Sequence, residues 1–189
     1  MPKITATTPP PRILICGEPA SGKTGALAQL ANAGYRLMIH DFDQNTRVIP
    51  SYLNSDAADV YVSTYAAAKI TSTNLFSGAT GQASKQALEE LRRFCKMLEH
   101  WKVAGGEDLG QSSGWTAKDV VVIDSGTFLG DLLLLAAHED PETKRDLRSL
   151  YNVAGRYYAA ILDHLTGNKM GASVIVLTHI MQILSLIHI

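Results

Sequence analysis

The sequence predicts an α/β fold with a mainly parallel sheet and helices on both of its faces. One observation is the order strand, glycine-rich turn and helix between residues 12 and 31. Another is a pair of apolar runs, 36–40 and 120–123, each followed directly by an aspartate. A further apolar run covers 172–178. Near-continuous apolar strands separated by helical patterns are typical of parallel sheets that are buried on both faces.

The composition fits one globular domain. The chain has 189 residues, of which 46% are hydrophobic, and its formal net charge is −1. This composition supports a sizeable core and provides no overall basic excess for nucleic acid. Two cysteines and no signal-peptide pattern predict reduced thiols and a cytoplasmic location. Cys16 is expected to pack inside the first strand.

The first strand leads into residues 17–24, which match the motif G-x-x-x-x-G-K-T. Residues 12–16 form the apolar strand, and the Ala- and Leu-rich residues 24–31 continue as a helix. This order directs backbone N–H groups and the positive end of the helix toward one point, which suits triphosphate oxygens. Lys23 is placed to reach the β- and γ-phosphates, and the Thr24 hydroxyl to ligate Mg²⁺. A glycine-rich turn that matches by chance is the alternative, and both flanks argue against it. The residues expected to contact the nucleotide are Gly17, Glu18, Pro19, Ala20, Ser21, Gly22, Lys23, Thr24 and Gly25.

The next elements follow from periodicity and turn residues. The first helix is expected to stop near Gly34, a suitable C-cap. A second strand over 36–41 ends in an aspartate, Asp41, and a short third strand covers 59–63. Residues 63–82, rich in Thr, Ser, Ala and Gly, are expected to form a surface segment. Apolar residues at spacings of three and four then predict a helix over 84–101.

The polar face of this helix has two interpretations. Arg92, Arg93 and Lys96 can contact DNA or simply form a solvated face, and their mixture with glutamates favours the solvated face. The glycine-rich residues 103–118 are expected to be a loop.

An aspartate follows the fourth strand. Four β-branched residues, 120–123, deliver Asp124 to the carboxyl end of a buried strand, where ligands bind in α/β sheets. Asp124 is thereby placed to hold Mg²⁺, directly or through water. Capping of the helix that begins near Gly126 is a compatible structural role. Residues 132–137 are expected to form a buried helix face.

The last third of the chain contains a helix and a strand. Residues 140–142 are expected to interrupt the helical pattern, and residues 147–165 are expected to form a long helix. The buried strand 172–179 ends at His179. The whole stretch 171–189 is apolar, but polar residues interrupt it and its first half is a core strand, so no membrane span is predicted.

The final six residues match what one frame of a common sequencing adapter encodes, so we expect an artefact there. The natural protein is then expected to continue with the strands that close the sheet. The expected organisation is a flexible arm over 1–11, a domain over 12–183 that is incomplete at its C-terminus, and an artefactual tail over 184–189.

Four motifs in this order resemble the RecA-like ATPases, most of all the small phage-type members linked to single-strand annealing and recombination. They are GEPASGKT at 17–24, HDFDQ at 40–44, VVVIDS at 120–125 and IVLTH at 175–179. The resemblance covers about residues 12–180. It implies a three-layer P-loop NTPase fold and hydrolysis of ATP with Mg²⁺. It further implies single-stranded DNA as a partner, a homo-oligomer with an arginine finger across the subunit boundary, and the host-cell cytoplasm if a phage encodes the chain.

The resemblance also assigns catalytic residues. In the family the second strand commonly ends Asp-x-Glu, and the glutamate polarises the attacking water. The matching triplet is 41–43, so Asp43 takes that place with a side chain one methylene shorter, and Asp41 and the more remote Glu18 are alternative bases. His179 matches the polar γ-phosphate sensor, and a structural histidine is the other interpretation. The expected catalytic set is Lys23, Asp43, Asp124 and His179.

Two other functions remain open: a nucleotide or nucleoside kinase, and a nucleotide-dependent binding module with little hydrolysis. A kinase needs an acceptor pocket and usually an arginine-bearing lid, and only residues 140–148 suggest a lid. Sheet order separates the two enzymes, because RecA-like ATPases insert a strand between the phosphate-loop strand and the strand that ends in the metal-binding aspartate (the Walker B strand, here 120–124). In nucleotide kinases those two strands are neighbours. We expect 174–178 to be the inserted strand, pairing in parallel with 13–16 and 120–123.

Overall fold

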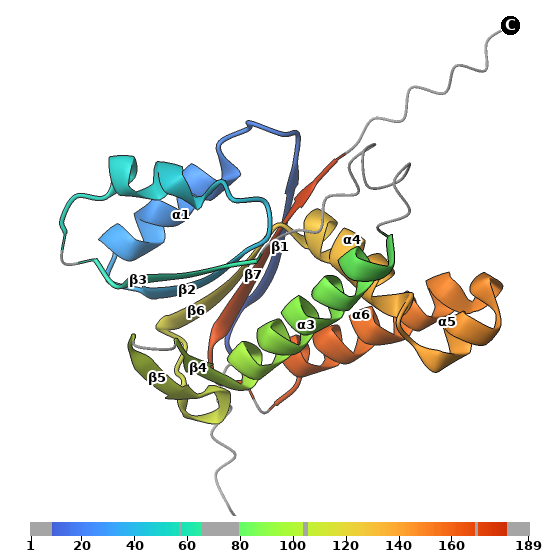
Figure 1. Cartoon of the computed structure of the whole chain (residues 1–189). Helices are drawn as coiled ribbons and strands as arrows, with labels where there is room; N and C mark the ends of the chain where they lie inside the picture. Colours follow the sequence, from blue (N-terminus) through green and yellow to red (C-terminus); the bar gives the residue numbers. More distant parts are fainter. Residues whose placement is uncertain (1–8, 57, 66–79, 104–105, 169, 181–189) are drawn as a thin grey trace, which may run out of the picture.

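A parallel sheet of five strands lies at the centre of the computed structural model, in the order β1-β7-β6-β2-β3 (Figure 1). The structure describes residues 9–56, 58–65, 80–103, 106–168 and 170–180. The strands of the central sheet are β1 (Arg12–Gly17), β2 (Arg36–Asp41), β3 (Val60–Thr64), β6 (Asp119–Asp124) and β7 (Ser173–His179).

Helices cover both faces of this sheet (Figure 1). The first face carries α1 (Lys23–Asn32) and the 3₁₀ helix η1 (Thr46–Tyr52). The second face carries α3 (Thr80–Glu99), α4 (Gly126–Ala137) and α6 (Leu150–Thr166). The prediction of an α/β fold with a parallel sheet between two helical layers is confirmed at this level. The smaller elements are β4 (His100–Lys102), β5 (Asp108–Gln111), η2 (Ser112–Gly114), α5 (Pro141–Arg145) and η3 (Leu147–Ser149).

The central strands are apolar along their whole length because both of their faces are buried. Successive strand residues point to opposite faces. In β6, Val120 and Val122 pack in the cluster of α1, whereas Val121 and Ile123 pack in the cluster of α3, α4 and α6. The near-continuous hydrophobic pattern is therefore a direct consequence of the two helical layers.

Strand β7 lies between β1 and β6, as predicted. Ile175 is in register with Ile13 on one side and with Val122 on the other, and both ladders are parallel. The carboxyl ends of β1, β7, β6 and β2 consequently lie side by side. This arrangement brings the ends of four separate sequence motifs to one edge of the sheet.

Several local predictions were wrong or incomplete. Residues 103–118 are not only a loop, because β5 pairs there with β4 in an antiparallel hairpin. Residues 140–142 do not only interrupt the helical pattern, because they also start α5. The Asp140 carboxylate accepts a hydrogen bond from the N–H of Glu142 and caps that helix. Cys16 is exposed, since β1 is an edge strand. Most of the predicted surface segment over 63–82 lies outside the described residues.

The buried His40 makes stability sensitive to acid. Its Nδ1 lies 2.8 Å from the Tyr65 hydroxyl, and the rings of Phe94 and Trp101 pack against the imidazole. Burial lowers the pKa of His40 to about 3, and the nearby Arg93 acts in the same direction. Between pH 6.5 and 3 the unfolded chain therefore binds a proton that the folded chain excludes, so stability falls as pH falls.

We expect His40→Asn to remove this dependence. Between pH 7 and 5, protonation of the unfolded histidine should cost the native protein about 2 kcal/mol of unfolding free energy, and the variant should lack that loss. Urea unfolding of both proteins at the two pH values measures the difference. The quantity compared is the change in unfolding free energy between the two pH values, because the substitution also changes packing and so shifts the absolute stability. An equal change in both proteins would contradict the assignment.

Candidate functional site

The loop between β1 and α1 closes tightly because of its glycines. Gly22 has φ of +82°, a left-handed conformation that glycine adopts without strain, and α1 begins at the next residue. A Cβ on Gly17 would lie 3.0 Å from Ser21 Oγ, so a side chain at residue 17 would require the Ser21 side chain to shift. The first N–H groups of α1 have no acceptor within the helix and are therefore available to a ligand at its start.

The Lys23 side chain lies across this loop. Its Nζ donates to the carbonyl oxygens of Gly17 and Glu18, at 3.0 and 2.7 Å, and to Ser21 Oγ at 3.2 Å. All three acceptors are neutral. A phosphate oxygen would be a stronger, charge-assisted acceptor for the same ammonium group.

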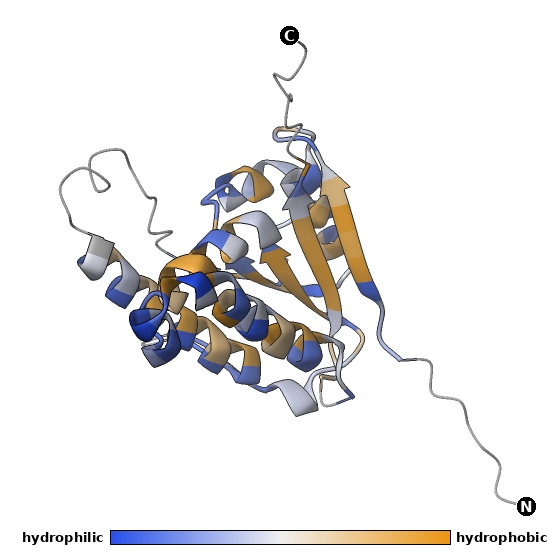
Figure 2. Ribbon diagram, turned by 90° about the vertical axis from the view of Figure 1, so that its right-hand side faces the viewer, coloured by the Kyte–Doolittle hydropathy of each residue, from blue (hydrophilic) through white to orange (hydrophobic). Residues whose placement is uncertain are grey.

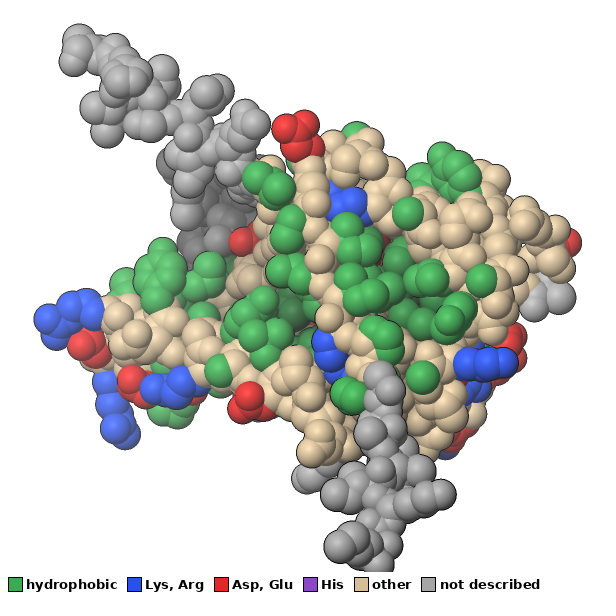
Figure 3. All heavy atoms as spheres, turned by 180° about the vertical axis from the view of Figure 1, so that it is seen from behind, with side chains coloured by type: hydrophobic (Ala, Val, Ile, Leu, Met, Phe, Trp, Pro, Cys, Tyr) green, Lys and Arg blue, Asp and Glu red, His purple; other side chains and the backbone are tan. Residues whose placement is uncertain are grey.

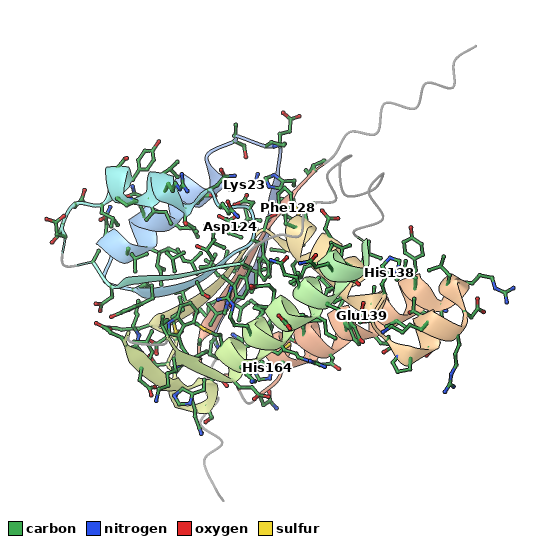
Figure 4. All side chains as sticks on the ribbon, in the orientation of Figure 1. Lys23, Asp124, Phe128, His138, Glu139 and His164 are labelled. Carbon is green, nitrogen blue, oxygen red and sulfur yellow. The ribbon has the colours of Figure 1, made fainter. Side chains whose placement is uncertain are left out.

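Thr24 and Asp124, the two residues expected to hold Mg²⁺, lie in direct contact. Thr24 Oγ1 donates to Asp124 Oδ2 over 2.7 Å, although the residues are 100 positions apart in the sequence. Figure 4 shows Asp124 beside Lys23 at the end of the sheet. Burial raises the pKa of Asp124 to about 6, and the carboxylates of Asp43 and Asp41 add to this, whereas Thr24 and Lys23 oppose it. A cation at this position would relieve that repulsion.

The three candidate carboxylates for a general base differ in their surroundings. Both carboxylate oxygens of Asp41 accept hydrogen bonds. Oδ1 accepts from the N–H of Gln44 at 2.7 Å, and Oδ2 accepts from the Thr46 hydroxyl at 2.5 Å. Burial raises the pKa of Asp41. Glu18 is exposed. Of the three, only Asp43 lines the cavity beside the loop.

His179 and Asp43 face each other at the carboxyl ends of β7 and β2. His179 Nε2 lies 3.5 Å from Asp43 Oδ2. The backbone N–H of His179 donates to Thr127 Oγ1 at 3.0 Å, and the Phe128 ring packs edge-on against the imidazole. His179 Nδ1 is buried without a hydrogen-bond partner in the described part of the chain. These contacts hold the imidazole beside the cavity, with Nε2 toward Asp43.

A cavity of about 350 Å³ connects these residues. The contribution of η1 to this cavity was not predicted from the sequence. The Tyr52 ring packs over Gly25, where an added Cβ would lie 3.1 Å from Tyr52 Cε2. No local pattern marks Tyr52, because its position depends on how η1 packs against α1. The lining residues are Ala20, Ser21, Gly22, Lys23, Thr24, Gly25, Asp43, Asn45, Val48, Tyr52 and His179.

The remaining predicted loop residues contribute differently. Gly17 and Glu18 hold Lys23 through their carbonyl oxygens and do not line the cavity, and Pro19 is outside the lining as well. Asp124 lies behind Thr24 rather than on the cavity wall. The structure thus brings Lys23 and Thr24 together with the carboxyl ends of three further strands.

The oxygens of Thr24 and Asp124 fit Mg²⁺. The described residues contain no cluster of three or more His, Cys, Asp or Glu side chains that could hold a metal ion. Mg²⁺ bound with a nucleotide does not need such a cluster, because it takes one or two protein oxygens and completes its shell with phosphate and water. A hydroxyl and a carboxylate 2.7 Å apart supply those oxygens.

No protein-family model matches this chain, and no curated protein matches it either. Within the described ranges, none of the helices combines the length and the hydropathy that crossing a bilayer requires.

Proposed function

We propose that this chain is a Mg²⁺-dependent ATPase of the RecA-like type. The observation that carries the proposal is the contact of Thr24 Oγ1 with Asp124 Oδ2 beside a glycine loop that holds Lys23. A triphosphate placed in the loop would meet backbone N–H groups, an ammonium group and a metal-binding oxygen pair at once. Lys23, Thr24 and Asp124 therefore supply complementary groups for a nucleotide bound with Mg²⁺.

Each residue then has a part in hydrolysis. Lys23 and the loop N–H groups stabilise the charge that develops on the γ-phosphate oxygens. Mg²⁺ bound by Thr24 and Asp124 would neutralise further charge on the β- and γ-phosphates. Asp43 orients the attacking water and accepts its proton. His179, next to Asp43, donates a hydrogen bond to the γ-phosphate.

The sheet order supports the RecA-like ATPase over a nucleotide kinase, because β7 separates β1 from β6. None of the residues suggested as a kinase lid is among the described residues that line the cavity beside the loop. They follow α4, a helix about 18 Å long that starts directly after Ser125. In the described structure Lys144 pairs with Glu139 and Arg148 with Asp146 instead. None of the described residues that line the cavity is an arginine.

The wider role rests on the order of the four motifs. By that resemblance we propose action in phage DNA recombination or single-strand annealing, with single-stranded DNA and further copies of the chain as partners. A second copy would supply an arginine finger. The net charge of −1 adds no electrostatic support for DNA binding.

Phosphate release by the purified chain tests the proposal. We expect ATP hydrolysis that requires Mg²⁺ and increases with single-stranded DNA, with the increase lost at high salt as phosphate contacts are screened. Transfer of labelled phosphate to a nucleoside or nucleotide acceptor would instead identify a kinase. Tight ATP binding without turnover, with or without DNA, would identify a binding module.

Tyr52 offers a prediction about the nucleobase. It is the only aromatic ring of the Phe, Tyr or Trp type that lines the described cavity, and more than half of its surface is exposed. Stacking of a base on this ring is expected to contribute about tenfold in affinity. Tyr52→Ala should therefore weaken ATP binding by about that factor and leave tripolyphosphate binding unchanged, and Tyr52→Phe should keep both. Equal weakening of both ligands would contradict the stacking role.

A further inference from the structure

The carboxyl end of β7 extends beyond β6, the strand on one of its sides. Leu177 is the last β7 residue in register with β6, where it faces Asp124, and β6 ends at that aspartate. Thr178 and His179 continue past this point with β1 on their other side. A backbone N–H group that is kept from water needs an acceptor. On the side where β6 has ended, that acceptor has to come from something other than a strand.

The first turn of α4 supplies the acceptor. Thr127 Oγ1 accepts a hydrogen bond from the backbone N–H of His179 at 3.0 Å. The same oxygen lies 3.0 Å from Thr178 Oγ1, so the Thr127 hydroxyl can donate its own proton there. One side chain thus bonds to both residues by which β7 extends beyond β6.

The residues on either side of Thr127 also contact β7. A Cβ on Gly126 would lie 3.0 Å from Val176 Cγ1, so the helix passes close to the strand at this glycine. After Thr127, the Phe128 ring packs edge-on against the imidazole of His179, with the ring centres 5.9 Å apart. Three consecutive residues of α4 therefore hold the end of β7, and they contact both the backbone and the ring of His179.

The other side of β7 is supported less firmly in the described structure. Its neighbour there is β1, which Figure 2 shows as a hydrophobic strand at the outer edge of the sheet. Leu14 is 64% exposed and Ile13 is 46% exposed, and Figure 3 shows hydrophobic side chains gathered on the face seen from behind. Segments with few buried contacts open more readily than well-packed ones. The contact with α4 is therefore the one that fixes the end of β7.

We propose that Thr127 is a positioning residue that holds His179 at the γ-phosphate end of the cavity. This role rests on the proposed ATPase activity, because it concerns the histidine that donates to the γ-phosphate. His179 lines the cavity, and its Nε2 lies 3.5 Å from Asp43 Oδ2. Thr127 is not among the described residues of the lining, so it acts on the nucleotide through His179. A shift of the strand end moves the imidazole away from both Asp43 and the phosphate.

The same turn connects the histidine to the metal-binding pair. Asp124, whose Oδ2 accepts from Thr24 Oγ1, directly precedes the segment that contains Thr127. The carboxylate for Mg²⁺ and the support of His179 thus belong to one short stretch of chain. Their separation is fixed before the nucleotide binds, which is the preorganisation that stabilisation of a transition state requires.

Amide hydrogen exchange of the nucleotide-free chain tests the contact itself. Thr127→Val keeps the shape of the side chain and removes the hydroxyl, so the N–H of His179 loses its acceptor. Its exchange, followed by NMR, is expected to become about tenfold faster or more. The N–H of Val174, which bonds to the carbonyl oxygen of Pro11 at the other end of β7, is the internal reference and should be unchanged. Thr127→Ser keeps the hydroxyl and should keep the slow exchange.

Turnover of the same variants tests the role of the contact. Thr127→Val is expected to lower single-turnover ATP hydrolysis about tenfold, because a small misplacement of a catalytic group is costly. Its affinity for ADP should be unchanged, since ADP has no γ-phosphate. Thr127→Ser should restore turnover. Thr166→Val is the matched control, because it removes a hydroxyl bonded to a main-chain oxygen within α6, and it should leave turnover unchanged.

A double-mutant cycle separates positioning from a general loosening of the fold. In a His179→Ala background, Thr127→Val is expected to have no further effect, because the side chain that it positions is absent. A further loss of about tenfold in that background, a weaker affinity for ADP, or unchanged exchange at His179 in Thr127→Val would overturn the proposal. Absence of hydrolysis by the wild-type chain would contradict the proposed ATPase instead, and the exchange measurement would still decide whether Thr127 holds His179.

Discussion

Replacement of Lys23 by alanine is expected to abolish ATP turnover and to leave the fold intact. In the part of the chain that the structure describes, the ammonium group hydrogen-bonds to Gly17, Glu18 and Ser21 of its own loop, and Lys23 belongs to neither hydrophobic cluster. Its removal should therefore change the free energy of unfolding by less than about 1 kcal/mol. Loss of the charge beside the γ-phosphate should lower turnover at least about 100-fold.

Four further variants sharpen this test. Lys118→Ala removes an exposed lysine elsewhere in the described structure and should leave turnover unchanged. Lys23→Arg keeps the charge but replaces a compact ammonium group with a planar fork, so it is not expected to restore activity. Thr24→Ser keeps the hydroxyl that faces Asp124 and should retain turnover, whereas Thr24→Ala should lose it. A folded Lys23→Ala protein with normal hydrolysis would exclude this loop as the catalytic site.

The site could be predicted largely because each of its parts follows a strand that is recognisable by itself. The runs before Gly17 and Asp124 are apolar and β-branched, and parallel strands bring their carboxyl ends to one edge. The contact between Thr24 and Asp124 follows from that rule, although no local signal links them. The insertion of β7 was likewise predictable, because a strand apolar along its whole length needs cover on both faces.

The errors have a physical cause too. Cys16 lies in a strand as apolar as β6, and only the order of the strands places β1 at an edge, where the thiol is exposed. The short strands β4 and β5 are too brief for a periodic pattern, and their hairpin contains Gly110 at φ of +80°. Tyr52 belongs to the cavity through the packing of η1 on α1, which the spacing of residues does not encode.

Replacement of Asp43 by asparagine is expected to lower hydrolysis about 100-fold or more and to leave ATP affinity nearly unchanged. The asparagine keeps the size of the side chain and can keep the hydrogen bond from the N–H of Asn45 to Oδ1, and it loses only the oxygen that accepts from Asn45 Nδ2. It cannot accept a proton from water at the place where Asp43 now faces His179. Single-turnover phosphate release and the binding of a fluorescent ATP analogue separate the two effects.

Asp41→Asn is the matched control, since it makes the same chemical change two residues away. Both oxygens of Asp41 are engaged by Gln44 and Thr46 and hold the turn after β2, so this variant should lose about 1 kcal/mol of stability and little catalysis. Asp43→Glu introduces the longer carboxylate that RecA-like ATPases commonly carry at this place, and this variant should keep much of the wild-type turnover. If Asp41→Asn abolishes hydrolysis and Asp43→Asn does not, the general base is Asp41, and the pair of Asp43 with His179 has a structural role.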